Sequence, residues 1–307
     1  MQTLPAKSYA PASKNSLMRE HFVRFIKFGF YPIGLVLTLA FIYLNTQKLL
    51  GNPKQAYTIY LIVVIGSMLL LEWTMPARPD WSMTWRSFLR RDVPMMVVNG
   101  VALAGTTFCL TALTQWIDVS AVNLTKWLPW WGQAFAAILI SDFLWYWVHR
   151  YSHEGQGRFG QWLWKTHVAH HLPKQVYVFM HAAGHPINGA YVRAILMLPP
   201  VFLGFSAEAI FAAAVLTGFQ GLVSHFNVDI RAGYFNYIFM GTELHRYHHS
   251  AALSEGKNYA AVVTIWDQLF GSFDYHPGSV PESLGVHERE AYPGSDEILS
   301  VMALPFK

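Results

Sequence analysis

Apolar residues in this chain occur in long runs that short polar links separate. Four of the runs cover residues 28–44, 57–73, 93–116 and 135–148. Their lengths are close to the roughly 20 residues that a helix needs to cross the hydrocarbon core of a bilayer. Because lipid cannot satisfy unpaired backbone groups, each run is predicted to be a transmembrane helix.

A fifth apolar region, residues 187–226, is nearly continuous, but Pro199-Pro200 and Gly204-Phe205-Ser206 interrupt it. Its length fits two short spans that form a hairpin, and it equally fits a re-entrant pair that dips into one leaflet. The pattern therefore predicts an all-α fold, a multi-span transmembrane helical bundle with four spans and an apolar hairpin. A helical cap outside the spans is expected to carry the histidines described below.

Composition divides the chain into four parts. Residues 1–27 are expected to be a flexible N-terminal tail, because the first 18 residues lack the apolar run and cleavage site of a signal peptide. Residues 28–130 hold the N-terminal transmembrane helices, and residues 131–273 form a histidine-rich catalytic domain with its own spans and cap. Residues 274–307, which are rich in proline and glycine, are expected to be an irregular polar tail.

Hydrophobic residues make up 53% of the chain and charged residues 13%, which agrees with a membrane protein. Basic residues are concentrated before the first span and between the second and third. They are Lys7, Lys14, Arg19, Arg24 and Lys27, then Arg78, Arg86, Arg90 and Arg91. The positive-inside rule places both segments in the cytoplasm, and an even number of crossings returns every histidine segment there. No basic run is dense enough to indicate nucleic acid binding.

Histidine is the unusual residue of this chain, with 14 copies. Three motifs stand out: His149-Arg150-Tyr151-Ser152-His153, His167-Val168-Ala169-His170-His171 and His245-Arg246-Tyr247-His248-His249. On a helix, residues three and four apart share a face, so their imidazoles can reach one ion. Adjacent histidines in the last two motifs can serve different ions. His181, His185 and His225 lie between the second and third motifs.

Imidazole suits iron, copper, nickel and zinc, and the single cysteine, Cys109, excludes a cysteine-ligated site. Eight or more rings are too many for one ion, so two metals are the economical interpretation. Bis-histidine haem would not explain the adjacent pairs. A metal transporter is a rival interpretation, but transporters usually carry ligands along a path across the bilayer, whereas these ligands cluster beyond the span ends on one side.

The order and surroundings of the three motifs resemble those of the fatty acid hydroxylase/sterol desaturase superfamily of integral-membrane di-iron enzymes. The likeness includes Ser141-Asp142-Phe143-Leu144-Trp145 before the first motif and Trp162-Leu163-Trp164-Lys165-Thr166 before the second. It continues after the third motif in Asn258-Tyr259 and in Ile265-Trp266-Asp267-Gln268-Leu269-Phe270-Gly271-Ser272-Phe273. It covers about residues 135–273, and the first three spans match only as generic apolar helices.

The resemblance implies two iron ions, O₂ as co-substrate and an external electron donor, and zinc can replace the iron on purification. The metal ligands that it implies are His149, His153, His167, His170, His171, His245, His248 and His249. His225 stands where relatives supply a further ligand. His185 with Pro186 resembles a pair common in the family, although Ala183-Gly184 replaces the arginine that many members place before it.

The activity that this resemblance implies is O₂-dependent hydroxylation of an unactivated C–H bond in a membrane lipid, fatty acyl chain or sterol. Desaturation by the same machinery is the alternative, and a membrane metal-binding or transport protein is a distant one. The expected partners are the lipid and a separate reductase, ferredoxin or haem donor. With no endoplasmic-reticulum retrieval tail visible, we expect a bacterial inner membrane with the metal site on the cytoplasmic side.

Three charged residues near the motifs are further candidates. Asp142 lies inside the fourth span, where a carboxylate is costly, and it is expected to orient a ligating imidazole; a structural hydrogen bond is the alternative. Arg150 and Arg246 each adjoin a ligating histidine and can contact an anionic headgroup, or else pair with Asp142 or Asp267. The substrate is expected to enter laterally through a mostly apolar slot between helices.

Overall fold

The fold is that of a helical bundle, seen in a computed structural model that describes residues 14–116 and 127–307. The long helices are α1 (Lys14–Thr46), α2 (Pro53–Thr74), α4 (Val93–Thr114), α5 (Trp130–Glu154), α6 (Gly157–His171), α7 (Pro186–Phe202) and α8 (Ala207–Ser224). Short helices are α3 (Trp85–Ser87), α9 (Thr242–His248), α10 (Ile265–Leu269) and α11 (Ile298–Met302). Within the described ranges the backbone forms isolated β-bridges and no strand.

Shorter helical turns connect these elements. They are η1 (Pro79–Trp81), the π-helical η2 (Phe88–Asp92), η5 (Val178–Ala182), η6 (Gly233–Tyr237), η7 (Arg289–Ala291) and η8 (Leu304–Phe306).

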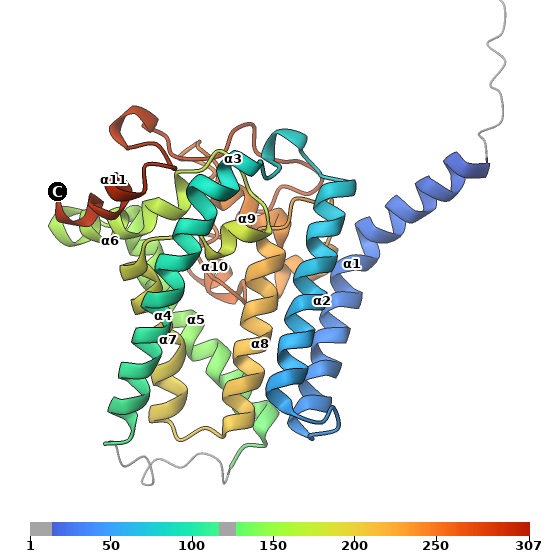
Figure 1. The fold of residues 1–307 in the computed structure, drawn as a ribbon, viewed down its shortest axis with the longest axis vertical. Coiled ribbons are helices and arrows are strands. Elements are labelled where there is room, and N and C mark those ends of the chain that lie inside the picture. The colour runs from blue at the N-terminus through green and yellow to red at the C-terminus, as the bar shows by residue number, and fades with distance from the viewer. Residues whose placement is uncertain (1–13, 117–126) are drawn as a thin grey trace, which may run out of the picture.

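Helices α1, α2, α4, α5, α7 and α8 run along one axis and alternate in direction (Figure 1). The α1–α2 and α7–α8 turns lie at one end of the bundle. The opposite end holds α3, α6, α9, α11 and the C-terminus. Helix α7 packs on α4 and α5, while α8 packs on α1 and α5. The alternation brings all three histidine motifs to the same end.

Four helical segments are long and apolar enough to cross a membrane: Leu17–Thr46, Pro53–Thr74, Pro79–Thr114 and Ala207–Ser224. Their apolar side chains are largely exposed on the outside of the bundle; in the third segment only 6% of the apolar window is buried. This confirms a membrane-spanning helical bundle. Three of these segments correspond to the first three expected spans. The fourth expected span lies in α5, which is not among the four; its place is taken by α8, which with α7 forms the expected hairpin.

Local sequence sets where these helices begin. The Asn52 side chain accepts hydrogen bonds from the amides of Lys54 and Gln55 at the start of α2, and Ser206 accepts one from the Ala209 amide at the start of α8. The expected break at Pro199-Pro200 does not occur, because α7 continues to Phe202. The chain turns instead at Gly204, whose φ of 66° favours glycine.

The two ends of the chain differ from the expectation. Residues 14–27, expected to belong to a flexible tail, form the first turns of α1, which project away from the bundle (Figure 1). Residues with good helix propensity, such as Leu17, Met18 and Arg19, allow this extension. The expectation for residues 1–13 lies outside the described part. Near the other end, Val301 and Leu304 pack on Val168 of α6, so this segment is an ordered cover.

Candidate metal centre

Five histidines bring one ligand nitrogen each to a common point, where these atoms lie within 4.8 Å of one another. They are His149, His153, His167, His171 and His248. The last two turns of α5 supply the first pair, the end of α6 the second pair, and α9 the single ring. We call this the five-histidine site.

A second cluster consists of His170, His225, His245 and His249, and their ligand nitrogens also lie within 4.8 Å of one another. His225 follows the last residue of α8, and the other three rings come from α6 and from the end of α9. We call this the four-histidine site. The two sites adjoin, because the rings of His171 and His249 stack with centroids 4.5 Å apart.

The two His-x-x-His-His motifs are divided between the sites in opposite ways. From the α6 motif, His167 and His171 belong to the five-histidine site and His170 to the four-histidine site. From the α9 motif, His245 and His249 belong to the four-histidine site and His248 to the five-histidine site. Histidines four apart thus share a site, and adjacent histidines belong to different sites, as one turn of an α-helix requires.

Backbone and side-chain acceptors fix the orientation of several rings through their Nδ1 atoms. In the five-histidine site, Nδ1–H of His149 donates to the Tyr259 carbonyl at 2.6 Å, that of His167 to Asn188 Oδ1 at 2.9 Å, and that of His248 to the Lys257 carbonyl at 2.9 Å.

In the four-histidine site, Nδ1–H of His170 donates to the Ala183 carbonyl and Nδ1–H of His225 to the Gly221 carbonyl, both at 2.8 Å. A neutral ring that donates through Nδ1 carries a lone pair on Nε2, which is the atom that binds metal.

The Nε2 atoms lie at distances that fit a shared ion. The Nε2 atoms of His149 and His167 are 2.9 Å apart, and those of His170 and His225 are 3.0 Å apart. In each pair both Nδ1 atoms donate elsewhere, so the facing Nε2 atoms hold lone pairs that repel. Two neighbouring nitrogens at about 2.1 Å from one octahedral ion lie about 3.0 Å apart, so a bound cation removes this repulsion. The donor set therefore fits a metal at each site.

Burial keeps these histidines in the form that binds metal. Desolvation is the largest cause that lowers the pKa of His149, His167 and His171, with nearby rings adding to it, and it lowers the pKa of His248 to about 3. Neutral imidazole at physiological pH follows. The Nε2 atoms of His153 and His248 are also buried and find no hydrogen-bond partner among the described residues.

The Asp142 carboxylate does not contact an imidazole. It accepts hydrogen bonds from the amides of Ala261, Val262 and Val263 at 2.8–3.2 Å. Asp267 accepts from the amides of Tyr259 and Ala260 in the same way. Together the two carboxylates hold segment 259–263. The Tyr259 carbonyl of this segment orients His149. Asp142 therefore acts on the His149 ring indirectly, through the backbone of segment 259–263.

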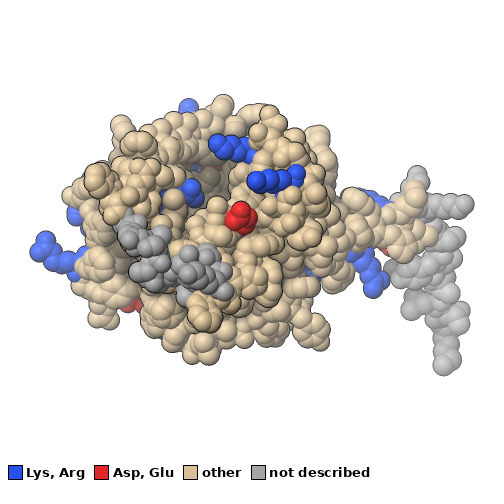
Figure 2. All heavy atoms as spheres, turned by 90° about the horizontal axis from the view of Figure 1, so that it is seen from below, with Lys and Arg blue, Asp and Glu red and all other residues tan. Residues whose placement is uncertain are grey.

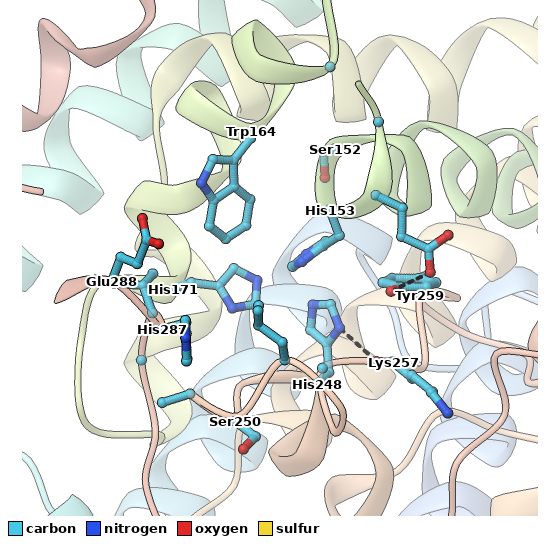
Figure 3. A pocket seen from close by; sticks show the side chains of 18 of the residues that line it. Ser152, His153, Trp164, His171, His248, Ser250, Lys257, Tyr259, His287 and Glu288 are labelled. Atoms are coloured by element: carbon cyan, nitrogen blue, oxygen red, sulfur yellow. Dashed lines mark hydrogen bonds between the residues drawn. The ribbon is translucent and has the colours of Figure 1, made fainter. Parts of the chain in front are cut away.

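A pocket of about 410 Å³ opens beside the five-histidine site. His153, His171 and His248 converge on one side of it, while Ser250, Lys257 and Glu288 lie around it (Figure 3). Trp164 and His287 complete this part of the lining. The five-histidine site is thus bordered by a pocket at the end of the molecule that carries the short helices.

The remaining candidates lie away from the two sites or beside them. His185 is buried at the start of α7, where Nδ1 accepts from the Ile187 amide and Nε2 donates to the Met302 carbonyl, so the structure does not bring it to either site. His181 is exposed, and its ring lies 5.5 Å from that of His225.

The two arginines beside the motifs have partners other than Asp142 and Asp267. Arg150 forms an ion pair with Glu154 at 2.7 Å and also donates to the Phe270 carbonyl. Arg246 is buried and donates to the carbonyls of Phe226 and Val228.

Several groups that orient the histidine rings cannot be predicted from the sequence. The carbonyls of Tyr259, Lys257, Ala183 and Gly221 carry no side-chain signal, because every residue has a carbonyl. Asn188 is a polar residue in an apolar helix, and this is the one feature that marks it. Glu72 lies near the end of α2, and its carboxylate accepts hydrogen bonds from the amides of Val178 and Asn227. It thereby joins α2 to two segments near the four-histidine site.

Comparison with known proteins places this geometry in context. Residues 134–272 match the family described as fatty acid hydroxylase. An ornithine lipid hydroxylase, OlsE, of Rhizobium tropici is 29% identical over 258 residues, which cover 81% of this chain and 75% of the relative.

The human alkylglycerol monooxygenase is 29% identical over 168 residues, covering 52% of this chain and 34% of that protein. Methylsterol monooxygenase 2-2 of Arabidopsis thaliana is 25% identical over 152 residues, covering 47% of this chain and 55% of the relative. No solved structure matches the chain.

Proposed function

We propose that this chain is a member of the fatty acid hydroxylase/sterol desaturase superfamily and an O₂-dependent monooxygenase that hydroxylates an unactivated C–H bond of a membrane lipid. The observation that carries the proposal is the convergence of nine histidine nitrogens on two adjoining sites. The relatives are an ornithine lipid hydroxylase, an alkylglycerol monooxygenase and a methylsterol monooxygenase, which supports a lipid as the substrate.

Iron bound at the two sites supplies the reduction of O₂ and the oxidation of the C–H bond. One oxygen atom enters the lipid as a hydroxyl, and the other leaves as water. Two electrons from a separate donor and two protons balance the reaction. A reductase, ferredoxin or haem protein is the class of donor that we propose, because the described residues bring no other redox group to the sites.

The residues of the chain have three tasks in this scheme. Nine imidazoles bind the ions, and the carbonyls of Tyr259, Lys257, Ala183 and Gly221 hold their rings. The surrounding helices exclude water from the reacting carbon. The bundle positions the lipid, since a substrate already in the bilayer can approach between helices.

We further propose that the enzyme lies in a bacterial inner membrane with both sites on the cytoplasmic side. The end that carries the histidines also carries the basic link between α2 and α4, with Arg78, Arg86, Arg90 and Arg91. The positive-inside rule puts such a link in the cytoplasm. Cysteine labelling at Ser152 or Ser250 in oriented vesicles tests this: labelling from the periplasmic side would reverse the orientation.

Lipid mass spectrometry of cells with and without the gene tests the main proposal. A lipid that gains one oxygen atom supports hydroxylation. A lipid that loses two hydrogens assigns the chain to desaturation instead. Metal flux into vesicles without O₂ consumption would show a transporter and overturn both assignments.

A further inference from the structure

Arg193 is the only charged residue in α4 and α7. It lies seven residues after the start of α7 and nine before its end, so it stands near the middle of the bundle, about 10 Å along the axis from the histidine end. Its Nε donates to Thr107 Oγ1 of α4 at 3.0 Å. No carboxylate among the described residues forms an ion pair with it.

A guanidinium at this depth is costly, because neither lipid nor a neutral hydroxyl balances its charge. An arginine at the end of a span can extend its side chain to the interface. From the middle of a helix that packs on α4 and α5, the distance to either interface is greater. Such a residue is a candidate for binding an anion that arrives with the substrate.

Arg193 faces a gap in the bundle. Thr107, its hydrogen-bond partner, lies on α4, and the Tyr57 hydroxyl of α2 is within its electrostatic reach. Helices α2 and α4 do not pack closely on each other, although both contact η5 at the histidine end. Seen from the opposite end, the molecule is hollowed, and a basic side chain is visible inside the hollow (Figure 2).

One face of α8 continues from this gap to the four-histidine site. Phe211, Ala214, Gly218, Gly221 and His225 follow one another at intervals of three or four residues, so they share a face. Ala214 is exposed although α8 packs on α1 and α5, and no atom lies within 4 Å of the position that a Gly218 Cβ would take. A Cβ on Gly221 would meet the His181 ring. This face is therefore open at Gly218, and at Gly221 the His181 ring covers it, 5.5 Å from the ring of His225.

We propose that Arg193 binds the carboxylate of a single-chain lipid, whose hydrocarbon tail lies along this face of α8 and ends at the four-histidine site. A carboxylate accepts two parallel hydrogen bonds from a guanidinium, and Nε alone is engaged by Thr107. The proposal rests on the proposed function and adds the substrate class to it. It also sets the position of oxidation: the reacting carbon is many bonds from the carboxylate, because Arg193 is about 10 Å from the histidine end.

Binding of two probes of equal chain length, palmitate and hexadecanol, tests the anchor without turnover. Zinc-loaded protein in detergent is titrated with each probe, and displacement of a fluorescent fatty acid gives the affinity. We expect the wild type to prefer palmitate by about tenfold or more. Arg193→Gln should lose this preference and keep its affinity for hexadecanol. Arg193→Lys, which keeps the charge but not the paired donors, should retain part of it.

Lys54→Gln is the matched control, since it removes an exposed positive charge at the start of α2 and should leave the preference unchanged. An undiminished palmitate preference in Arg193→Gln would overturn the anchor, as would an equal loss in Lys54→Gln. If Arg193→Gln does not fold, an undiminished preference in Arg193→Lys would count against paired binding.

Product analysis separates this proposal from the function itself. Oxygenated lipid without an Arg193-dependent preference defeats the anchor and leaves the monooxygenase standing. An Arg193-dependent preference without any oxygenated product supports the anchor and defeats the monooxygenase proposal. Oxidation next to the carboxylate of a fatty acid would contradict the geometry of the anchor.

Discussion

The five-histidine and four-histidine sites adjoin, but they differ in donors and in surroundings. On an octahedral ion, five imidazoles would leave one position open, and four would leave two. The first site borders a pocket at the end of the molecule. The second lies where the open face of α8 ends, beside His181. The site with more free positions is thus the one that meets the interior of the bundle.

This difference suggests a division of labour between two ions in similar nitrogen cages. The five-histidine site offers one more ligand than the other, and three of its rings donate to fixed acceptors. In the four-histidine site, Nδ1 of His245 is buried and has no hydrogen-bond partner within residues 14–116 and 127–307. We expect the lipid to approach the four-histidine site, and the pocket beside the five-histidine site to communicate with water.

Loss of a ligand should have the largest effect and should be selective for one site. His248→Ala removes a ring from the five-histidine site and His170→Ala one from the four-histidine site. Each variant should lose one of two bound metals and more than about 99% of turnover, since ligand loss exceeds the 10- to 100-fold cost of losing an outer partner. Elemental analysis and product mass spectrometry measure both, and membrane insertion should persist.

The assignment of these rings to two separate metal sites is wrong if either variant still binds two metals with wild-type affinity. Turnover above about a tenth of the wild-type value in either variant would also show that the ring is not a ligand.

Weakening the hydrogen bonds by which Asp142 and Asp267 hold segment 259–263 should affect one site and not the other. Asp142→Asn weakens acceptors for three backbone amides, and the Tyr259 carbonyl orients His149 only. We expect metal affinity at the five-histidine site to fall about 10- to 100-fold, as for other outer partners. In a titration with a chelator, the metal of the five-histidine site should be released at a lower chelator concentration than in the wild type. The metal of the four-histidine site should be released at the same concentration as in the wild type. Simultaneous release of both metals would show that these carboxylate contacts support both metal sites.

A larger side chain on the open face of α8 should affect the substrate and not the metals. Gly218→Leu fills a space that no atom occupies, so we expect normal metal content and a fall in kcat/KM of about tenfold, because the lipid loses its path. Gly66→Leu is the control, since Gly66 is exposed on α2 and also has free space around it. Equal activities of the two variants would place the lipid path elsewhere.

Acidification should have the smallest effect, on the stability of the metal-free protein. The folded pKa values of the buried histidines lie below the ordinary 6.5, and that of His248 is about 3. Below pH 6.5 the unfolded chain therefore binds more protons than the folded one, and stability that is present above 6.5 is lost as the pH falls. The midpoint temperature of thermal unfolding should fall as the pH is lowered from 7.5 to about 5, and the histidines of both sites should contribute to this fall. A midpoint that rises would contradict the neutral form of the rings.

Spacing and apolar runs predict the bundle, the end at which the histidines meet and the split between adjacent rings. Helix geometry alone separates His170 from His171. Which rings meet across elements depends on packing, since His248 joins α5 and α6 through about 80–100 residues of intervening chain. Asp142 is conspicuous because it is charged inside a span, yet its partners lie about 120 residues later. Periodicity carries no information about such distant contacts.

The placement of His245–His249 after the last long helix has a consequence for biosynthesis. Among the described residues, the last membrane-spanning helix ends at Ser224, whereas both sites need rings from residues 245–249. During translation the spans are therefore made and can insert while each cage still lacks donors. Metal loading then follows insertion, and the cell can deliver iron to a chain that is already anchored in its membrane.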